Sequence, residues 1–167
     1  FNKVMSRFGV MFFENPVDAF YNINKSIKEG GSLNFVCWTN LMENEFHTAA
    51  TDIILKHIKR EYPKITRDPG PFAFNDNDYI EQILANSGFK NIKVEKKYTS
   101  ILTKDSVEKD TALLLSIGMG ARLLSEENLP IVKLSIIKSE IEQMCKKRKV
   151  NGEITYKTCL NYVSAIK

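Results

Sequence analysis

The run FNKVMSRFGVMFFENPVDAFYNINKSIKEGGSLNFVCW, residues 1–38, reveals the fold class. An apolar segment over Phe1–Phe13 is expected to be a buried strand with its exit loop. Asn15-Pro16 follows, where asparagine can cap a helix and proline can open its first turn. Apolar residues then recur at helical spacing until Gly30-Gly31, which we expect to end the helix. Because Ser32–Trp38 is a second short apolar strand, the order predicts a βαβ unit, and hence a parallel sheet covered by helices.

The rest of the chain continues the alternation of helices and strands. Helical spacing, caps and glycine or proline punctuation separate the segments. The expected elements are a helix ending at about Arg60, a loop over the YPKITRDPGPFAF sequence, a helix from Asn75–Asp78 to Gly88, a strand over Phe89 to about Ile101, helices over Asp105 to about Leu124 and Leu129 to about Lys149, and a last strand over Glu153–Lys167.

The composition is that of a globular chain without special bias. Of 167 residues, 43% are hydrophobic and 26% charged, which is enough apolar material for a core. The net charge is +4, and the densest basic run, Lys146–Lys149, ends an expected helix, where cations complement the helix dipole. We therefore expect no nucleic-acid partner. No apolar run reaches the roughly 20 residues that span a bilayer.

The three cysteines, Cys37, Cys145 and Cys159, are odd in number and far apart in the sequence. This spacing argues against a disulfide framework and against a zinc site, so no metal is expected. Unpaired cysteines also favour a reducing compartment, and we expect a cytoplasmic protein.

Four features in a fixed order resemble a known family. They are SRFGVMFF at Ser6–Phe13, KEGG before an apolar strand, CW and EN after that strand, and PGPFAF followed by a capped helix and SGF. Together they resemble the class I S-adenosylmethionine-dependent methyltransferases, and they are most similar to the ubiquinone and menaquinone biosynthesis C-methyltransferase type. The resemblance covers nearly the whole chain, most firmly Phe1 to about Tyr98.

The resemblance implies an α/β fold of the Rossmann-like class I methyltransferase type, with a mostly parallel sheet and an antiparallel last strand. Residues 1–167 would be the C-terminal part of one such domain, with a helical insertion at about 105–149 before the last strand. The family's N-terminal strands and glycine-rich cofactor loop would lie upstream and are absent here. Gly118-Met119-Gly120 is expected instead inside a helix, where small residues allow close helix contact.

The resemblance also implies S-adenosyl-L-methionine as the cofactor. In parallel α/β sheets, ligands bind beyond the carboxyl ends of the strands, near the point where the strand order reverses. The family's order puts the first strand of this chain at that point. We therefore expect Ser6, Arg7 and Phe8 to line the cofactor; the alternative is a strand end without a ligand role.

Methyl transfer from a sulfonium is a direct displacement that needs alignment and exclusion of water. A carbon or phenol acceptor also needs a group to take its proton, and His47 is the candidate for that catalytic role. Trp38, Phe72 and Phe74 are candidates for the substrate pocket, whose aromatic walls would suit a small, apolar acceptor; the resemblance implies one such as a quinone. The alternatives are a structural histidine and aromatic residues that anchor the core.

The predicted function is thus a methyltransferase acting on a small molecule, present as a fragment that alone is expected to be inactive. The alternative is a non-catalytic half-domain that pairs with a partner chain through its exposed strand edge. Unpaired strand edges can accept a further strand, so the same segment would serve either role.

Overall fold

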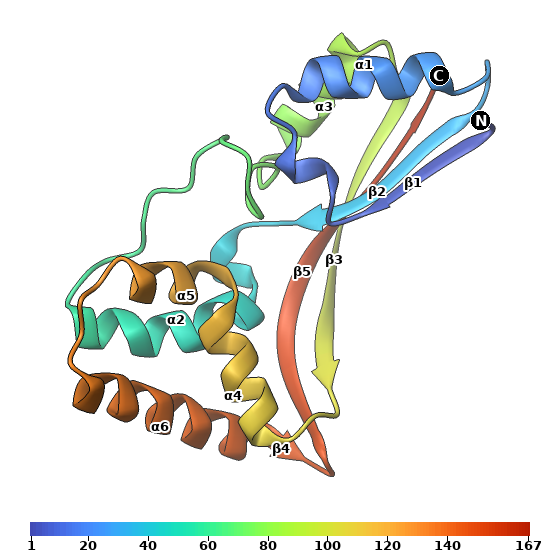
Figure 1. Ribbon diagram of the computed structural model, residues 1–167. Helices are drawn as coiled ribbons and strands as arrows, with labels where there is room; N and C mark the ends of the chain where they lie inside the picture. The colour runs from blue at the N-terminus through green and yellow to red at the C-terminus, as the bar shows by residue number, and fades with distance from the viewer. The chain divides into compact units, whose positions relative to one another are not determined.

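The computed structural model describes residues 1–167, and the chain is mixed α/β (Figure 1). It divides into two compact units. Unit 1 comprises Phe1–Glu43, Lys64–Thr99 and Cys159–Lys167, and unit 2 comprises Asn44–Pro63 and Ser100–Thr158. The insertion expected at about 105–149 lies within unit 2. No helix combines the length and apolarity that crossing a bilayer requires.

The order of elements follows the predicted alternation. Two strands, β3 (Lys90–Thr103) and β5 (Glu153–Ile166), contribute residues to both units. The other elements of unit 1 are β1 (Lys3–Arg7), the 3-10 turn η1 (Val10–Phe12), α1 (Pro16–Ser26), β2 (Ser32–Trp38), the 3-10 turn η2 (Leu41–Glu43) and α3 (Asn77–Asn86). Those of unit 2 are α2 (Glu45–Ile58), α4 (Val107–Ser116), α5 (Gly118–Ser125), α6 (Ile131–Arg148) and β4 (Lys149–Val150).

The sheet has the strand order β1-β2-β5-β3, and β4 pairs with β5. β1 is parallel to β2, with Lys3 opposite Ser32, which confirms the βαβ unit. β5 is antiparallel to β2, with Trp38 opposite Leu160, which confirms the antiparallel last strand. Figure 1 shows β3 running against β5, so β1, β2 and β3 share one direction. The last strand is therefore inserted between two strands that both precede it in the sequence.

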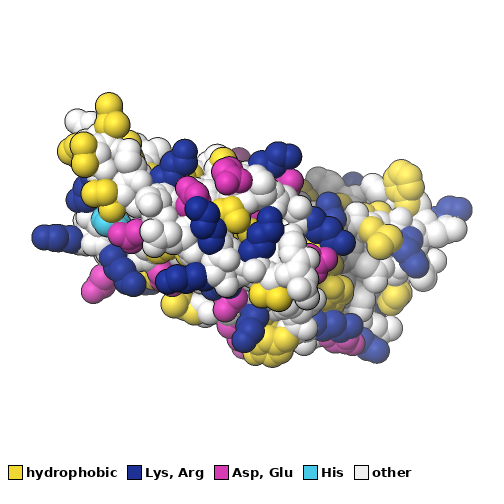
Figure 2. Space-filling model, turned by 90° about the horizontal axis from the view of Figure 1, so that it is seen from below, with side chains coloured by type: hydrophobic (Ala, Val, Ile, Leu, Met, Phe, Trp, Pro, Cys, Tyr) yellow, Lys and Arg dark blue, Asp and Glu magenta, His cyan; other side chains and the backbone are white.

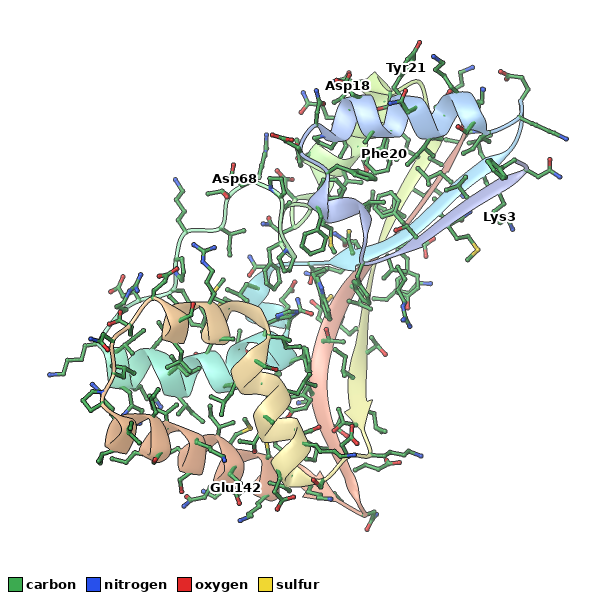
Figure 3. All side chains as sticks on the ribbon, viewed as in Figure 1. Lys3, Asp18, Phe20, Tyr21, Asp68 and Glu142 are labelled. Carbon is green, nitrogen blue, oxygen red and sulfur yellow. The ribbon has the colours of Figure 1, made fainter.

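Helix α1 begins as the sequence predicts. The Asn15 side chain accepts a hydrogen bond from the Asp18 amide at 3.2 Å, and Pro16 occupies the first turn. Figure 3 shows Phe20 pointing from α1 toward the sheet, with Asp18 and Tyr21 on the other side. Phe20 is fully buried, and its ring lies 5.6 Å from that of Phe35 in β2.

The expected end of α1 at Gly30-Gly31 is wrong. The helix ends at Ser26, because Ile27 is already extended. Gly30 has a φ of +73°, which a side chain rarely adopts, and serves the turn into β2. Gly31 has no room for a side chain, since a Cβ there would lie 2.6 Å from Ile27 Cγ2 and 2.8 Å from the Asn2 carbonyl oxygen. The two glycines thus shape the helix-to-strand turn rather than cap the helix.

The expectation of a buried first strand is also wrong. β1 lies at one edge of the sheet, and its residues alternate between half-buried and exposed. Met5 is 76% exposed. The apolar residues that reach the core, Val10 and Met11, lie in η1 after the strand. Phe12, expected to contribute apolar surface to the core, is exposed.

Unit 2 is a helical layer with its own core. Ile54 of α2, Ile137 and Ile141 of α6 and Tyr156 of β5 are fully buried in one cluster. The single helix expected over Asp105 to about Leu124 is two helices, because Ile117 is extended and Gly118 has a φ of +79°.

Gly118-Met119-Gly120 is therefore helical, as expected, but it forms the first turn of α5 and not the interior of one long helix. The expected close helix contact is confirmed for Gly120. A Cβ there would lie 2.8 Å from Ile54 Cδ1 and 3.0 Å from Thr51 Oγ1, both on α2. The close approach of α5 to α2 explains why residue 120 is glycine. The change of chain direction between α4 and α5 explains why residue 118 is glycine.

Candidate functional site

The carboxyl ends of β1 and β2 bring two of the predicted site residues together. Phe8 follows β1 directly, has a φ of 56° and donates its amide to the Val36 carbonyl oxygen at 3.0 Å. Its ring stacks on Trp38 at the end of β2, with centroids 4.5 Å apart and planes 17° apart. Gly9 comes next, and a Cβ there would lie 3.2 Å from Ser6 Oγ. The turn is therefore tight, and the unusual φ of Phe8 aims its ring at the neighbouring strand.

Ser6 and Arg7 lie on β1 beside this aromatic pair. Ser6 is opposite Phe35 and Arg7 is opposite Val36 in the parallel register. The Ser6 side chain is half-buried and that of Arg7 is exposed. The three residues proposed for the cofactor thus form one strand end, and their cofactor role stays a prediction.

An acidic group that sequence reasoning missed lies just after β2. Glu43 Oε1 is 2.5 Å from Lys96 Nζ and accepts a hydrogen bond from the Tyr98 hydroxyl at 3.1 Å. Burial by itself raises the pKa of the Glu43 carboxyl. Hydrogen bonds from Lys96, Thr39 and Tyr98 outweigh burial, so the pKa lies below its usual value and the group is a carboxylate at neutral pH.

The signal for Glu43 in the sequence was weak. It stands in the LMEN segment after β2, where ligands of α/β sheets are commonly held. Two of its three partners, Lys96 and Tyr98, lie on β3, more than 50 residues later in the chain. Only the folded sheet brings this carboxylate, an ammonium group and a phenol together.

Phe72 and Phe74, two of the candidates for the substrate pocket, lie in the PGPFAF loop. Both are buried in unit 1, and Phe74 is 2% exposed. The Phe74 ring lies 6.1 Å from Phe20 and 6.0 Å from Tyr79, and its carbonyl oxygen is 3.8 Å from Cys37 Sγ. These contacts are those of a core anchor for the loop, which was the alternative interpretation. A substrate-pocket role for either residue stays a prediction.

His47 lies in unit 2, in the first turn of α2. It lines a cavity of about 10 Å³, the space of roughly one water molecule, together with Thr51 and Gly118–Gly120. Burial lowers the pKa of the imidazole to about 4, so the ring is neutral at pH 7. The neutral ring faces a cavity too small for an acceptor molecule, which favours a packing role. The catalytic role expected for His47 stays a prediction.

Comparison with known proteins finds similar solved structures but no similar sequence. No protein-family model and no curated protein matches the chain. A protein of Bacillus halodurans C-125 assigned as a methyltransferase aligns with all of this chain and 70% of its own, at 14% identity and a TM-score of 0.48.

Two structures of a phosphoethanolamine N-methyltransferase 2 of Haemonchus contortus also align with the whole chain. Identities are 14% and 15%, and TM-scores are 0.44 and 0.40. The first contains phosphomonomethylethanolamine and S-adenosylhomocysteine, and the second S-adenosyl-L-methionine. This chain spans 33% of the length of that enzyme in both structures. These three neighbours are thus methyltransferases, at a level of similarity too low to transfer their substrates or sites.

Proposed function

We propose that the chain is the C-terminal part of an S-adenosylmethionine-dependent methyltransferase that acts on a small molecule. The observation that carries the proposal is the Phe8–Trp38 stack at the carboxyl ends of two adjacent parallel strands. It lies where α/β sheets hold their ligands. The ordered sequence features from Ser6 to Phe89 and the last strand inserted antiparallel beside β2 support the same conclusion.

The residues at this strand end fit one wall of a site for S-adenosyl-L-methionine. Aromatic faces attract a ligand cation, and the cofactor is a sulfonium. The half-buried Phe8 presents such a surface next to the half-buried Ser6, and Trp38, which is 8% exposed, stacks against the Phe8 ring and holds it in place. The Gly118-Met119-Gly120 segment follows a helix, not a strand, so it lacks the context of a glycine-rich cofactor loop. We therefore propose that residues 1–167 alone bind the cofactor weakly and do not turn over.

When bound, the cofactor supplies an electrophilic methyl group on a positively charged sulfur. The contribution of this chain is to exclude water and to handle the proton of the acceptor. The stacked rings of Phe8 and Trp38 keep water from one side of the strand end. Glu43, ionised at neutral pH, can accept a proton at a carboxylate oxygen, and Lys96 and Tyr98 hold it in place. We propose Glu43 as the proton acceptor in preference to His47, because the cavity beside His47 holds about 10 Å³ and has no room for an acceptor.

Binding of S-adenosyl-L-methionine to the native full-length protein tests the cofactor wall. Isothermal titration calorimetry should show binding that Trp38→Leu and Phe8→Leu each weaken by about tenfold, which is the scale of a lost cation–π contact. Tyr162→Leu is the matched control, because Tyr162 is an aromatic residue of β5 in the same unit and is 40% exposed. No binding by the full protein, or equal losses in all three variants, would overturn the proposal.

The proton acceptor is tested by methyl-transfer kinetics of the full-length protein. Glu43→Gln should lower kcat by roughly 100-fold with little change in the cofactor dissociation constant. Glu95→Gln is the control, since Glu95 is an exposed carboxylate on β3 that pairs with Lys97 at 3.4 Å. An unchanged kcat in Glu43→Gln rules out the role.

The edge position of β1 favours a second candidate function, a half-domain that pairs with a partner strand. β1 is the first strand in the sheet order, and Met5 on it is exposed. Light scattering on the 167-residue chain separates the two. A monodisperse assembly that Met5→Lys converts to monomers supports strand pairing. A monomer, or heterogeneous aggregates, counts against it.

A further inference from the structure

The helices of unit 2 form an open apolar groove that the proposed function does not use. It has a volume of about 470 Å³, within the range of small-molecule sites. Leu115 of α4, Leu124 of α5 and the α6 residues Ile131, Leu134 and Ile137 supply its apolar lining. The groove lies wholly within unit 2.

The side chains around the groove are unusually apolar for a surface. Ile131 is 82% exposed and Val132 is 72% exposed, and both lie in the first turn of α6. An exposed apolar cluster of this kind is normally covered by a ligand, a membrane or another protein. Figure 2, seen from the side on which α6 lies, shows hydrophobic side chains gathered at one end of the face, with Lys and Arg beside them.

The polar groups of the groove indicate the chemistry of its ligand. Ser125 Oγ donates to the Arg122 carbonyl oxygen at 2.7 Å, and Ser135 Oγ donates to that of Ile131 at 3.0 Å. Both hydroxyl protons are therefore used within their own helices. The charged lining residue is Lys138, and unlike Lys146, which pairs with Glu142, it forms no ion pair. The groove thus offers an apolar floor and one uncompensated ammonium group.

We propose that this groove binds an anionic single-chain amphiphile, with its alkyl chain along α6 and its carboxylate at Lys138. Charge complementarity selects the carboxylate, since the cation at the rim has no acid of its own. The apolar lining selects an alkyl chain over a polar ligand, because the serine donors are already satisfied. The site is separate from the strand end that carries the proposed methyl transfer, so either proposal can fail without the other.

Titration of the full-length protein with sodium dodecanoate, below its micelle concentration, tests the proposal. We expect saturable one-to-one binding by calorimetry. Each methylene removed, from dodecanoate to decanoate, should weaken binding by about two- to fourfold, as expected for a chain that is partly or fully buried. The uncharged 1-dodecanol should bind about two- to fivefold more weakly than dodecanoate, the scale of an exposed ion pair.

Variants on one helix separate the groove from the general surface. Lys138→Ala should remove the preference for dodecanoate over 1-dodecanol. Lys133→Ala, a change to a half-buried lysine of α6 outside the lining, should keep that preference. Leu134→Gln should weaken the binding of dodecanoate by at least about fivefold. Ile136→Gln is its control, because Ile136 is 46% exposed and Leu134 is 41% exposed, and Ile136 does not line the groove.

Several outcomes would overturn the proposal. One is the absence of dodecanoate binding. Equal losses in Leu134→Gln and Ile136→Gln, or a chain-length effect that persists without saturation, would show nonspecific adsorption. Binding only to anionic phospholipid vesicles would assign the face to a membrane surface, and a dodecanoate-independent dimer broken by Leu134→Gln would assign it to a second copy.

Discussion

Substitution of either of the two adjacent glycines at the turn into β2, Gly30 and Gly31, should destabilise the protein. The physical reasons differ between the two positions, which gives a sharp test of the fold. At Gly31 a Cβ would meet three atoms closer than 3.0 Å, and two of them, the carbonyl oxygens of Asn2 and Lys28, are backbone. Backbone cannot turn aside as a side chain can. At Gly30 nothing lies within 4 Å of a Cβ, but φ is +73°.

The expected magnitudes differ accordingly. Overpacking typically costs about 1–3 kcal/mol, and we expect Gly31→Ala to lie near about 3 kcal/mol because the contacts cannot relax. Gly30→Ala should cost about 1–2 kcal/mol, the penalty of a side chain in the left-handed region. Asparagine tolerates that region, so Gly30→Asn should cost less than Gly30→Ala, whereas Gly31→Asn should be at least as harmful as Gly31→Ala.

Urea unfolding followed by the fluorescence of Trp38, the only tryptophan, measures these differences. A cost of about 3 kcal/mol corresponds to a fall in Tm of roughly 6–12 °C for a chain of this size. The reasoning would be refuted if Gly31→Ala were no more destabilising than Gly30→Ala, or if asparagine were tolerated equally at both positions.

Three further predictions concern local stability and titration. Asn15→Ala should destabilise the protein by about 1 kcal/mol in urea unfolding, because it removes the cap on the Asp18 amide, whereas Asn22→Ala, on the exposed side of α1, should have a small effect. Burial raises the pKa of the Cys37 thiol to about 12, so we expect Ellman's reagent to modify Cys37 at about pH 8 only at the rate of unfolding; rapid modification of the native protein would contradict this. The pKa of His47 is about 4 when folded, against 6.5 as the ordinary value, so the unfolded chain binds a proton in this window that the folded one does not. The free energy of unfolding should therefore fall by about 2 kcal/mol from pH 7 to 5. In His47→Gln the fall over the same interval should be smaller by about 2 kcal/mol, because the titrating group is gone.

Local signals in the sequence were sufficient for several elements. The bounds of β2, Ser32–Trp38, agree with the expected strand, because a short apolar run between a glycine pair and a polar segment leaves little choice. Asn15-Pro16 identified the start of α1. Asn151-Gly152, a residue pair that favours a tight hairpin turn, forms the turn between β4 and β5, and both residues have positive φ, at 52° and 86°.

Errors arose where a contact distant in the sequence decided the outcome. The apolar pattern from Leu113 to Leu124 continues through Gly118, and a helix tolerates one glycine at a cost of about 1 kcal/mol, so the break was invisible. The packing of Gly120 against α2 accompanies the break.

The candidate site was only partly accessible from the sequence. Phe8 and Trp38 were both nominated, for different roles, but their stacking depends on the parallel register of β1 and β2. Glu43 was missed because the partners that mark it, Lys96 and Tyr98, are contributed by β3. A sequence motif can identify candidate residues near a strand end, but the pairing of the strands determines which of them are in contact.

The position of β5 has a consequence for biosynthesis. Ser32 of β2 pairs with Ile166, so these partners are separated by 166 − 32 = 134 residues of chain. A ribosome therefore releases β2 long before the strand that completes its hydrogen bonding exists. During translation, β2 and β3 lack the strand that pairs with both of them, so their backbone N–H and C=O groups on that side stay unpaired. We therefore expect folding of the sheet to be late, slow and sensitive to chaperones.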